Sequence, residues 1–147
     1  MKRLIVALMV VGLLLSLVPG EAGALSGGDG VVTRISGTNR YATAAAISAF
    51  SRAYSGYAVL ARGDHYADAL AGVPLAAAYQ APILLTPVNS LATETKAELE
   101  ELDVHTVFIL GGTAAVGQAV EDELVEMGLT VERIKGANRF ATATAIA

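Results

Sequence analysis

Two closely similar segments of the sequence carry arginines at matching positions. Residues 32–48 recur as residues 131–147, and each copy contains Arg-Ile-x-Gly-x-Asn-Arg followed by an aromatic residue. An arginine is permanently charged and presents several N–H donors in one plane, so it can hold a phosphate or carboxylate group with two bonds. The candidate residues for contact with an anionic polymer are Arg34, Asn39, Arg40, Arg133 and Arg139. The same arginines are also suited to ion pairs with Asp64 or Asp68, within one unit or across a unit boundary.

A second candidate is the segment Gly-Asp-His-Tyr-Ala-Asp, residues 63–68, which follows an apolar run and opens a helical pattern. Two carboxylates beside His65 have the chemistry to ligate a divalent cation or to act as an acid/base pair. In the alternative interpretation, Asp64 caps the helix and Asp68 lies in its first turn, where the helix dipole favours negative charge. We adopt the second interpretation, so Asp64 and Asp68 are predicted structural residues and no metal site is predicted.

A third candidate is the turn Leu-Gly-Gly-Thr, in which Gly111 and Gly112 follow an apolar run. Backbone N–H groups at such a turn can bind a phosphate. However, the segment lacks the Lys-Ser/Thr ending of the nucleotide-binding loop and the glycine spacing of the dinucleotide fingerprint. We therefore predict a tight turn and no cofactor. No serine lies in a Gly-x-Ser-x-Gly context and the chain has no cysteine, so no catalytic nucleophile is indicated.

Alternating apolar and amphipathic segments must position these residues. Short Val-, Ile- and Leu-rich runs predict strands at 31–35, 57–61, 82–86, 106–110 and 129–134. Helical patterns occupy residues 41–54, 66–79, 93–102 and 116–127. Strict alternation favours an α/β fold with a parallel sheet. Pro74 is expected to kink or divide its helix. The run Pro82, Ile83, Leu84 and Leu85 is expected to be a buried central strand, because strands covered on both faces are continuously apolar.

The N-terminus has the pattern of a secretory signal peptide. Lys2 and Arg3 precede an apolar run, and a small-residue triplet at 22–24 predicts cleavage before Leu25, followed by a short flexible linker at 25–30. No membrane association is expected after cleavage. The net charge of −4 becomes more negative once the basic leader is removed, which argues against nucleic-acid binding.

The ordered motifs resemble the type-two cell wall binding repeat family of exported bacterial surface proteins. The resemblance is carried by Arg34–Ala44, Gly63–Leu70 continuing to Ala76, Pro82–Thr86 and Ile109–Gly112. It implies a Rossmann- or Toprim-like α/β fold, with one complete repeat at 31–130 and the start of a second at 131–147. It also implies a non-catalytic module at the cell surface that holds anionic envelope polymers, with its repeats around a pseudo-threefold axis. The alternatives are the N-terminal part of an exported, amidase-like wall hydrolase whose catalytic domain is expected beyond residue 147, and a surface-layer assembly module.

Overall fold

The computed structural model describes residues 32–51, 56–137 and 139–146. The chain divides into two units, residues 1–33 and 34–147, and the fold below is that of the second unit. The predicted signal peptide at 1–24 and the linker at 25–30 lie outside the described residues. Within the described ranges, no helix has the length and apolar character needed to span a membrane.

A four-stranded parallel sheet forms the centre of the unit. Its strands are β1 (Tyr57–Arg62), β2 (Ile83–Thr86), β3 (Thr106–Leu110) and β4 (Thr130–Ile134). The order across the sheet is β2-β1-β3-β4, and every neighbouring pair is parallel. In register, Val59 of β1 lies opposite Ile83 and Phe108, and Thr106 of β3 lies opposite Thr130. The predicted α/β class with a parallel sheet is confirmed.

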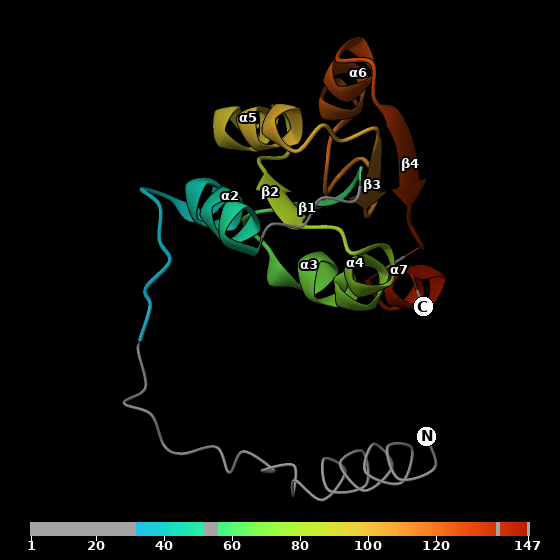
Figure 1. Ribbon diagram of the computed structural model, residues 1–147. Coiled ribbons are helices and arrows are strands. Elements are labelled where there is room, and N and C mark those ends of the chain that lie inside the picture. The colour runs from blue at the N-terminus through green and yellow to red at the C-terminus, as the bar shows by residue number, and fades with distance from the viewer. Residues whose placement is uncertain (1–31, 52–55, 138, 147) are drawn as a thin grey trace, which may run out of the picture. The chain divides into compact units, whose positions relative to one another are not determined.

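Helices cover both faces of this sheet (Figure 1). They are α2 (Arg40–Ser51), α3 (Tyr66–Ala71), α4 (Val73–Tyr79), α5 (Thr93–Glu101), α6 (Gln118–Glu126) and α7 (Arg139–Ile146). α5 and α6 lie over one face, α3, α4 and α7 lie over the other, and α2 packs against α5 and β2.

Each face of the sheet has its own apolar core. Beneath α5 and α6, Leu60, Leu84 and Ile109 from the strands pack with Leu99 and Leu124 from the helices. On the opposite face, the strand and helix side chains that pack together are Val59, Ala61, Ala76, Phe108, Leu110 and Ile146. Successive residues along β1 and β3 thus alternate between two buried layers, which is why these strands read as continuous apolar runs.

The strand predicted at residues 31–35 is not a strand in the described part of the segment. Residues 32–37 have no regular secondary structure, and the Val32 side chain is 93% exposed. A strand needs the backbone of a neighbour to satisfy its N–H and C=O groups. In the described sheet β1 and β3 have partners on both sides, and residues 32–37 pair with neither of the outer strands, β2 and β4. The apolar pattern of the segment was therefore a misleading signal in this first copy.

The prediction that residues 82–85 form a central strand is also wrong. Among the described residues β2 is an edge strand that pairs with β1 alone, and every second residue along it is buried. Leu84 and Thr86 are fully buried, and α2 packs on the same strand. Pro82 precedes the strand and its carbonyl accepts a hydrogen bond from the Val59 N–H at 2.9 Å. Edge strands tolerate proline because one side of the backbone has no ladder to complete.

The predicted division of the helix at 66–79 is confirmed, with the break at Gly72 and Pro74 in the first turn of α4. A Cβ atom at residue 72 would collide with the Leu110 side chain of β3. Glycine therefore allows the joint between α3 and α4 to approach the sheet, and proline is tolerated where the helix restarts because its missing N–H has no partner in a first turn.

Candidate functional site

The carboxyl ends of β1, β3 and β4 meet at a pocket of about 350 Å³. Its lining includes Arg62, His65, Asp68, Gly111, Gly136 and Thr142. Ligands of open parallel sheets bind at this edge, where the loops after the strands converge. We call this cavity the strand-end pocket.

Arg62, the last residue of β1, holds the loop beside the pocket through a two-bonded ion pair. Its Nε lies 2.6 Å from Oδ1 of Asp64, and its Nη2 lies 2.7 Å from Oδ2. This hydrogen-bonded arginine, with a smaller contribution from the charge of Arg40, holds the pKa of Asp64 below its usual value. Asp64 is therefore ionised, and its carboxylate pairs with the Nε and Nη2 edge of the Arg62 guanidinium.

The Arg62–Asp64 pair yields a prediction about titration. Arg62→Gln should raise the pKa of Asp64 towards its ordinary value, because the main cause of its lowering is removed. The stability linked to this shift is present above the ordinary carboxyl pKa and is lost as pH falls through the lowered one. A carboxyl carbon NMR titration measures the shift. Glu94, whose pKa is lowered by Asn39 instead, is the internal control. An unchanged Asp64 titration would contradict the assignment.

The cap of α3 differs from the prediction. His65 is the N-cap, and its Nδ1 accepts a hydrogen bond from the Ala67 N–H at 3.4 Å, so the prediction that Asp64 caps this helix is wrong. Asp64 is turned to Arg62 because a charged bidentate partner is stronger than a neutral backbone N–H. Asp68 does lie in the first turn, as predicted. No group of three or more His, Cys, Asp or Glu side chains in the described ranges is placed to hold a metal ion.

Asp68 also lies close to the glycine turn after β3. Gly111 has a φ of +92°, in the region that favours glycine, and a Cβ there would come within 3.1 Å of Asp68 Oδ2 and 2.9 Å of Ala115 Cβ. Both the backbone conformation and the space thus require glycine at this position. The tight turn predicted for Gly111 is confirmed, whereas Gly112 has open space around it.

Arg40 reaches the same loop from the start of α2. Its Nη1 donates a 2.8 Å hydrogen bond to the Gly63 carbonyl, rather than pairing with Asp64 or Asp68 as the alternative interpretation required. The ion pairs in the described part of the chain are Arg62–Asp64, Lys96–Glu123 and Arg133–Glu121. Arg40 is exposed. Because Arg40 bonds to Gly63 and Arg62 bonds to Asp64, the guanidinium groups of both arginines flank the loop that begins at Gly63.

Asn39 is the residue that positions Arg40. Its Oδ1 accepts a hydrogen bond from the Ala42 N–H at 2.9 Å, and its Nδ2 donates to Oε1 of Glu94 at 2.7 Å. The first bond satisfies a free N–H at the start of α2 and the second ties that helix to α5. Asn39 therefore fixes where the following arginine leaves the helix.

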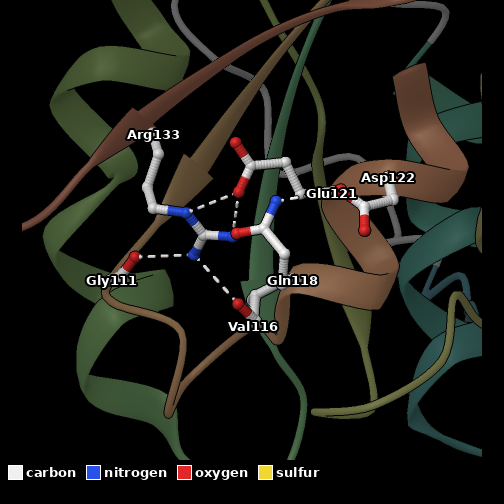
Figure 2. A network of polar contacts seen from close by, with 6 residues as sticks. All are labelled: Gly111, Val116, Gln118, Glu121, Asp122 and Arg133. Carbon is white, nitrogen blue, oxygen red and sulfur yellow. Dashed lines mark hydrogen bonds and ion pairs between the residues drawn. The ribbon is translucent and has the colours of Figure 1, made fainter.

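Arg133 belongs to a partly buried polar network of its own (Figure 2). Its side chain is 9% exposed, and its Nε and Nη2 lie 3.0 and 2.6 Å from Oε2 of Glu121. Its Nη1 donates to the carbonyls of Gly111 and Val116 at 3.1 and 2.9 Å. The network joins β4 to α6 and to the loop after β3, so its geometry is that of a structural clamp.

The two copies of the arginine motif therefore differ in surroundings. Arg34, which matches Arg133, is exposed in a segment without regular structure. The side chain of Arg139, which matches Arg40, lies outside the described features. The structure brings Arg40 and Asp64 together around one loop, and it places Arg133 on the far side of β3 from β1. Sequence reasoning missed Arg62, although its position at the end of a strand and next to Gly-Asp was a usable signal.

These features define an α/β module with a polar strand-end pocket and an arginine-flanked loop. A family model described as cell wall binding domain 2 (CWB2) matches residues 34–121. The chain belongs to the CWB2 family.

Relatives and solved structures agree with this membership. The chain is similar to N-acetylmuramoyl-L-alanine amidase LytC of Bacillus subtilis, with 40% identity over 119 residues, covering 81% of this chain and 24% of LytC. It is 32% identical over 117 residues to the amidase enhancer of the same organism, covering 80% of this chain and 16% of that protein. The chain thus spans a quarter or less of each relative.

Two solved structures have the same fold. Cwp6 from Clostridium difficile matches with a TM-score of 0.72 and 33% identity, covering 77% of this chain and 18% of Cwp6. Cwp8 from the same organism matches with a TM-score of 0.72 and 32% identity, covering 76% of this chain and 20% of Cwp8.

Proposed function

We propose that this chain is a non-catalytic module that anchors an exported protein to anionic polymers of the cell wall. The observation that carries the proposal is the CWB2 match over residues 34–121. The relatives named as an amidase and an amidase enhancer support it, because this chain matches only 24% and 16% of their lengths and leaves most of each protein to other parts. Other units of the same kind are proposed to pack beside this one around a pseudo-threefold axis.

We assign the polymer contact to Arg40, with Arg34 as its helper. Arg40 is exposed and gives one N–H to the Gly63 carbonyl, while its other N–H groups make no hydrogen bond within the described residues. Those donors suit a phosphate or carboxylate group of a polymer. Asn39 and Arg133 take positioning roles, since their polar atoms bond to Glu94 and Glu121. Arg139, at the matching position of the second copy, is the proposed repeat of the Arg40 contact.

Arg40→Gln should weaken retention on purified cell walls by about tenfold, because a charged hydrogen bond to an anion contributes roughly 1.5–3 kcal/mol. The loss should shrink as salt is added, because salt screens exposed charges. A cosedimentation isotherm at two salt concentrations measures both effects. The matched control is Lys96→Gln, which removes one positive charge at a surface pair with Glu123. Equal retention of the two variants would remove Arg40 from the site.

Export is the second part of the proposal. Protein recovered from the culture medium or from the wall should begin within a few residues of Leu25, because the small-residue triplet before it is the signal for cleavage. Intact mass and N-terminal peptide mapping measure this end. Recovery of a chain that still begins at Met1 would contradict the signal-peptide assignment.

One alternative function has a specific observation in its favour. The relative LytC is named as an amidase, and this chain covers 24% of it. The module would then be the wall-targeting part of an exported hydrolase whose catalytic domain lies elsewhere. Assembly of a surface layer is the remaining alternative, and it would leave wall retention independent of anionic polymer.

A further inference from the structure

The charge of the strand-end pocket differs from that of the exposed contact at Arg40. Among the described residues that line the pocket, the charged ones are Arg62 and Asp68. Asp64 already pairs with the Nε and Nη2 edge of Arg62, so the second carboxylate, Asp68, gives the pocket a surplus of negative charge. Like charges repel each other at short range. The pocket therefore disfavours a phosphate or carboxylate group, although such a group suits Arg40.

Asp68 supplies the pocket with an acceptor that has no partner of its own. Its side chain is half-buried, and within the described ranges its carboxylate accepts no hydrogen bond and forms no ion pair. The pKa of Arg62 is raised first by the hydrogen bond to Asp64 and, to a smaller degree, by the charges of Asp64 and Asp68. Asp68 thus lies near a guanidinium without bonding to it. Its free lone pairs can accept hydrogen bonds from two adjacent hydroxyl groups.

Two donors border the same space. The Nη1 group of Arg62 makes no hydrogen bond in the described part of the chain, where Asp64 bonds to Nε and Nη2. His65 accepts the Ala67 N–H at its Nδ1, which places the proton of the neutral imidazole on Nε2. Both side chains line the pocket. A ligand that carries several hydroxyl groups can therefore donate to Asp68 and accept from Arg62 and His65.

The size and walls of the pocket suit a sugar ring. Its volume of about 350 Å³ lies in the range of small-molecule sites and exceeds what a single ammonium group would occupy. Methyl groups and glycine backbone give walls on which the C–H face of a pyranose can pack, and the alanines among them are Ala67, Ala114, Ala115 and Ala137. A Cβ at Gly111 would come within 3.1 Å of Asp68 Oδ2, so glycine there leaves room for the carboxylate.

We propose that the strand-end pocket binds one uncharged sugar residue of the wall polymer, with adjacent hydroxyl groups of the sugar bonded to Asp68. Arg40 and Arg62 flank the same loop, so a polymer whose anionic group lies at Arg40 can place a neighbouring sugar in the pocket. The inference rests on the proposed function for the source of the sugar. The pocket then distinguishes polymers by their sugars, which an exposed arginine alone cannot do.

An amide NMR titration of the purified chain tests the site without any wall present. It follows the signals of Gly111, Gly112 and Gly136, which line the pocket. The probes are inorganic phosphate, methylammonium, and neutral oligosaccharides released from purified walls by hydrofluoric acid, which cleaves phosphodiester bonds. The oligosaccharides should shift the three signals saturably, whereas the two small ions should not. Absence of a shift with the oligosaccharides, or a saturable shift with either ion, overturns the proposal.

Two variants remove the site in different ways. Asp68→Asn removes the charged acceptor and should weaken oligosaccharide binding about tenfold, because charge-assisted hydrogen bonds are the stronger ones. Gly112→Phe places a ring at the pocket and should abolish binding. A Cβ at Gly112 meets no atom within 4 Å, so this variant keeps the fold and every charge.

The matched control is Asp103→Asn, which removes an exposed carboxylate at a φ of +51°, a conformation that asparagine tolerates. Binding that survives Gly112→Phe, or that falls equally in Asp68→Asn and Asp103→Asn, overturns the proposal. Arg40→Gln should leave the oligosaccharide shifts unchanged, because the neutral probe has no anionic group. Missing shifts together with wall retention that still depends on Arg40 overturn this inference alone. Normal shifts with retention independent of Arg40 support the pocket and count against the anionic contact alone.

Discussion

Arg133→Ala should lower the free energy of unfolding by about 3 kcal/mol, whereas Arg34→Ala should change it by less than about 0.5 kcal/mol. The two residues hold the same position in the duplicated motif. The Arg133 side chain is 9% exposed and bonds to Glu121 and to the carbonyls of Gly111 and Val116. Removing the Arg133 side chain leaves the Glu121 carboxylate and both carbonyl groups without this partner. Removing one partner of an ion pair in the protein interior is strongly destabilising, because the other charge is left uncompensated.

Urea denaturation followed by circular dichroism measures both variants of this matched pair. Arg133→Lys adds a further control, because an ammonium group keeps the charge but cannot reproduce the planar set of bonds. The free energy of unfolding of Arg133→Lys should lie between those of the wild type and the alanine variant. Equal stabilities of Arg133→Ala and Arg34→Ala would show that the clamp at Glu121 contributes nothing to the fold.

Leu84→Ala should cost about 2–5 kcal/mol of unfolding free energy, because it leaves a cavity in a packed core. Leu84 lies on β2, is 0% exposed and contributes to the core beneath α5. Its matched control is Leu70→Ala on α3, where the side chain is 63% exposed and the same substitution should have little effect.

Thermal and urea unfolding of the two leucine variants test this prediction, with wall retention measured on the folded fraction. We expect Leu84→Ala to bind walls normally once folded, because the residue has no access to solvent. A variant of normal stability that no longer binds walls would make β2 a surface site instead of a core strand.

Periodicity and breaker residues predicted the elements that local sequence controls. The apolar runs at β1, β2 and β3, the helices between them and the break near Pro74 all follow from patterns within a few residues. Both helices and strands can be recognised from the spacing of their apolar residues. Parallel pairing followed from the alternation of the two types of element, since each crossover needs a helix.

Properties that depend on neighbours could not be predicted in this way. The segments 32–35 and 131–134 have nearly the same sequence, yet only the second is a strand, because only it has β3 beside it. The apolar run of β2 indicates burial on two faces but carries no information about its place at the edge of the sheet. Strand order is set by packing across the whole unit.

The contacts of the candidate side chains differ from those that the sequence predicted. Arg40 and Asp64 do lie around one loop, but Arg62 takes the carboxylate and Arg40 bonds to the Gly63 carbonyl. The duplicated motif gave Arg34 and Arg133 the same candidate role, whereas the structure leaves Arg34 exposed and pairs Arg133 with Glu121. The sequence carries the charges, and the fold decides which arginine remains exposed to solvent.

Retention of the purified chain on cell walls, compared before and after chemical removal of their anionic polymer, is the most direct measurement of the proposed function. We expect saturable retention on intact walls and its loss on the stripped walls, where the phosphate or carboxylate groups that would face Arg40 are gone. Unchanged retention on the stripped walls would contradict the proposed function.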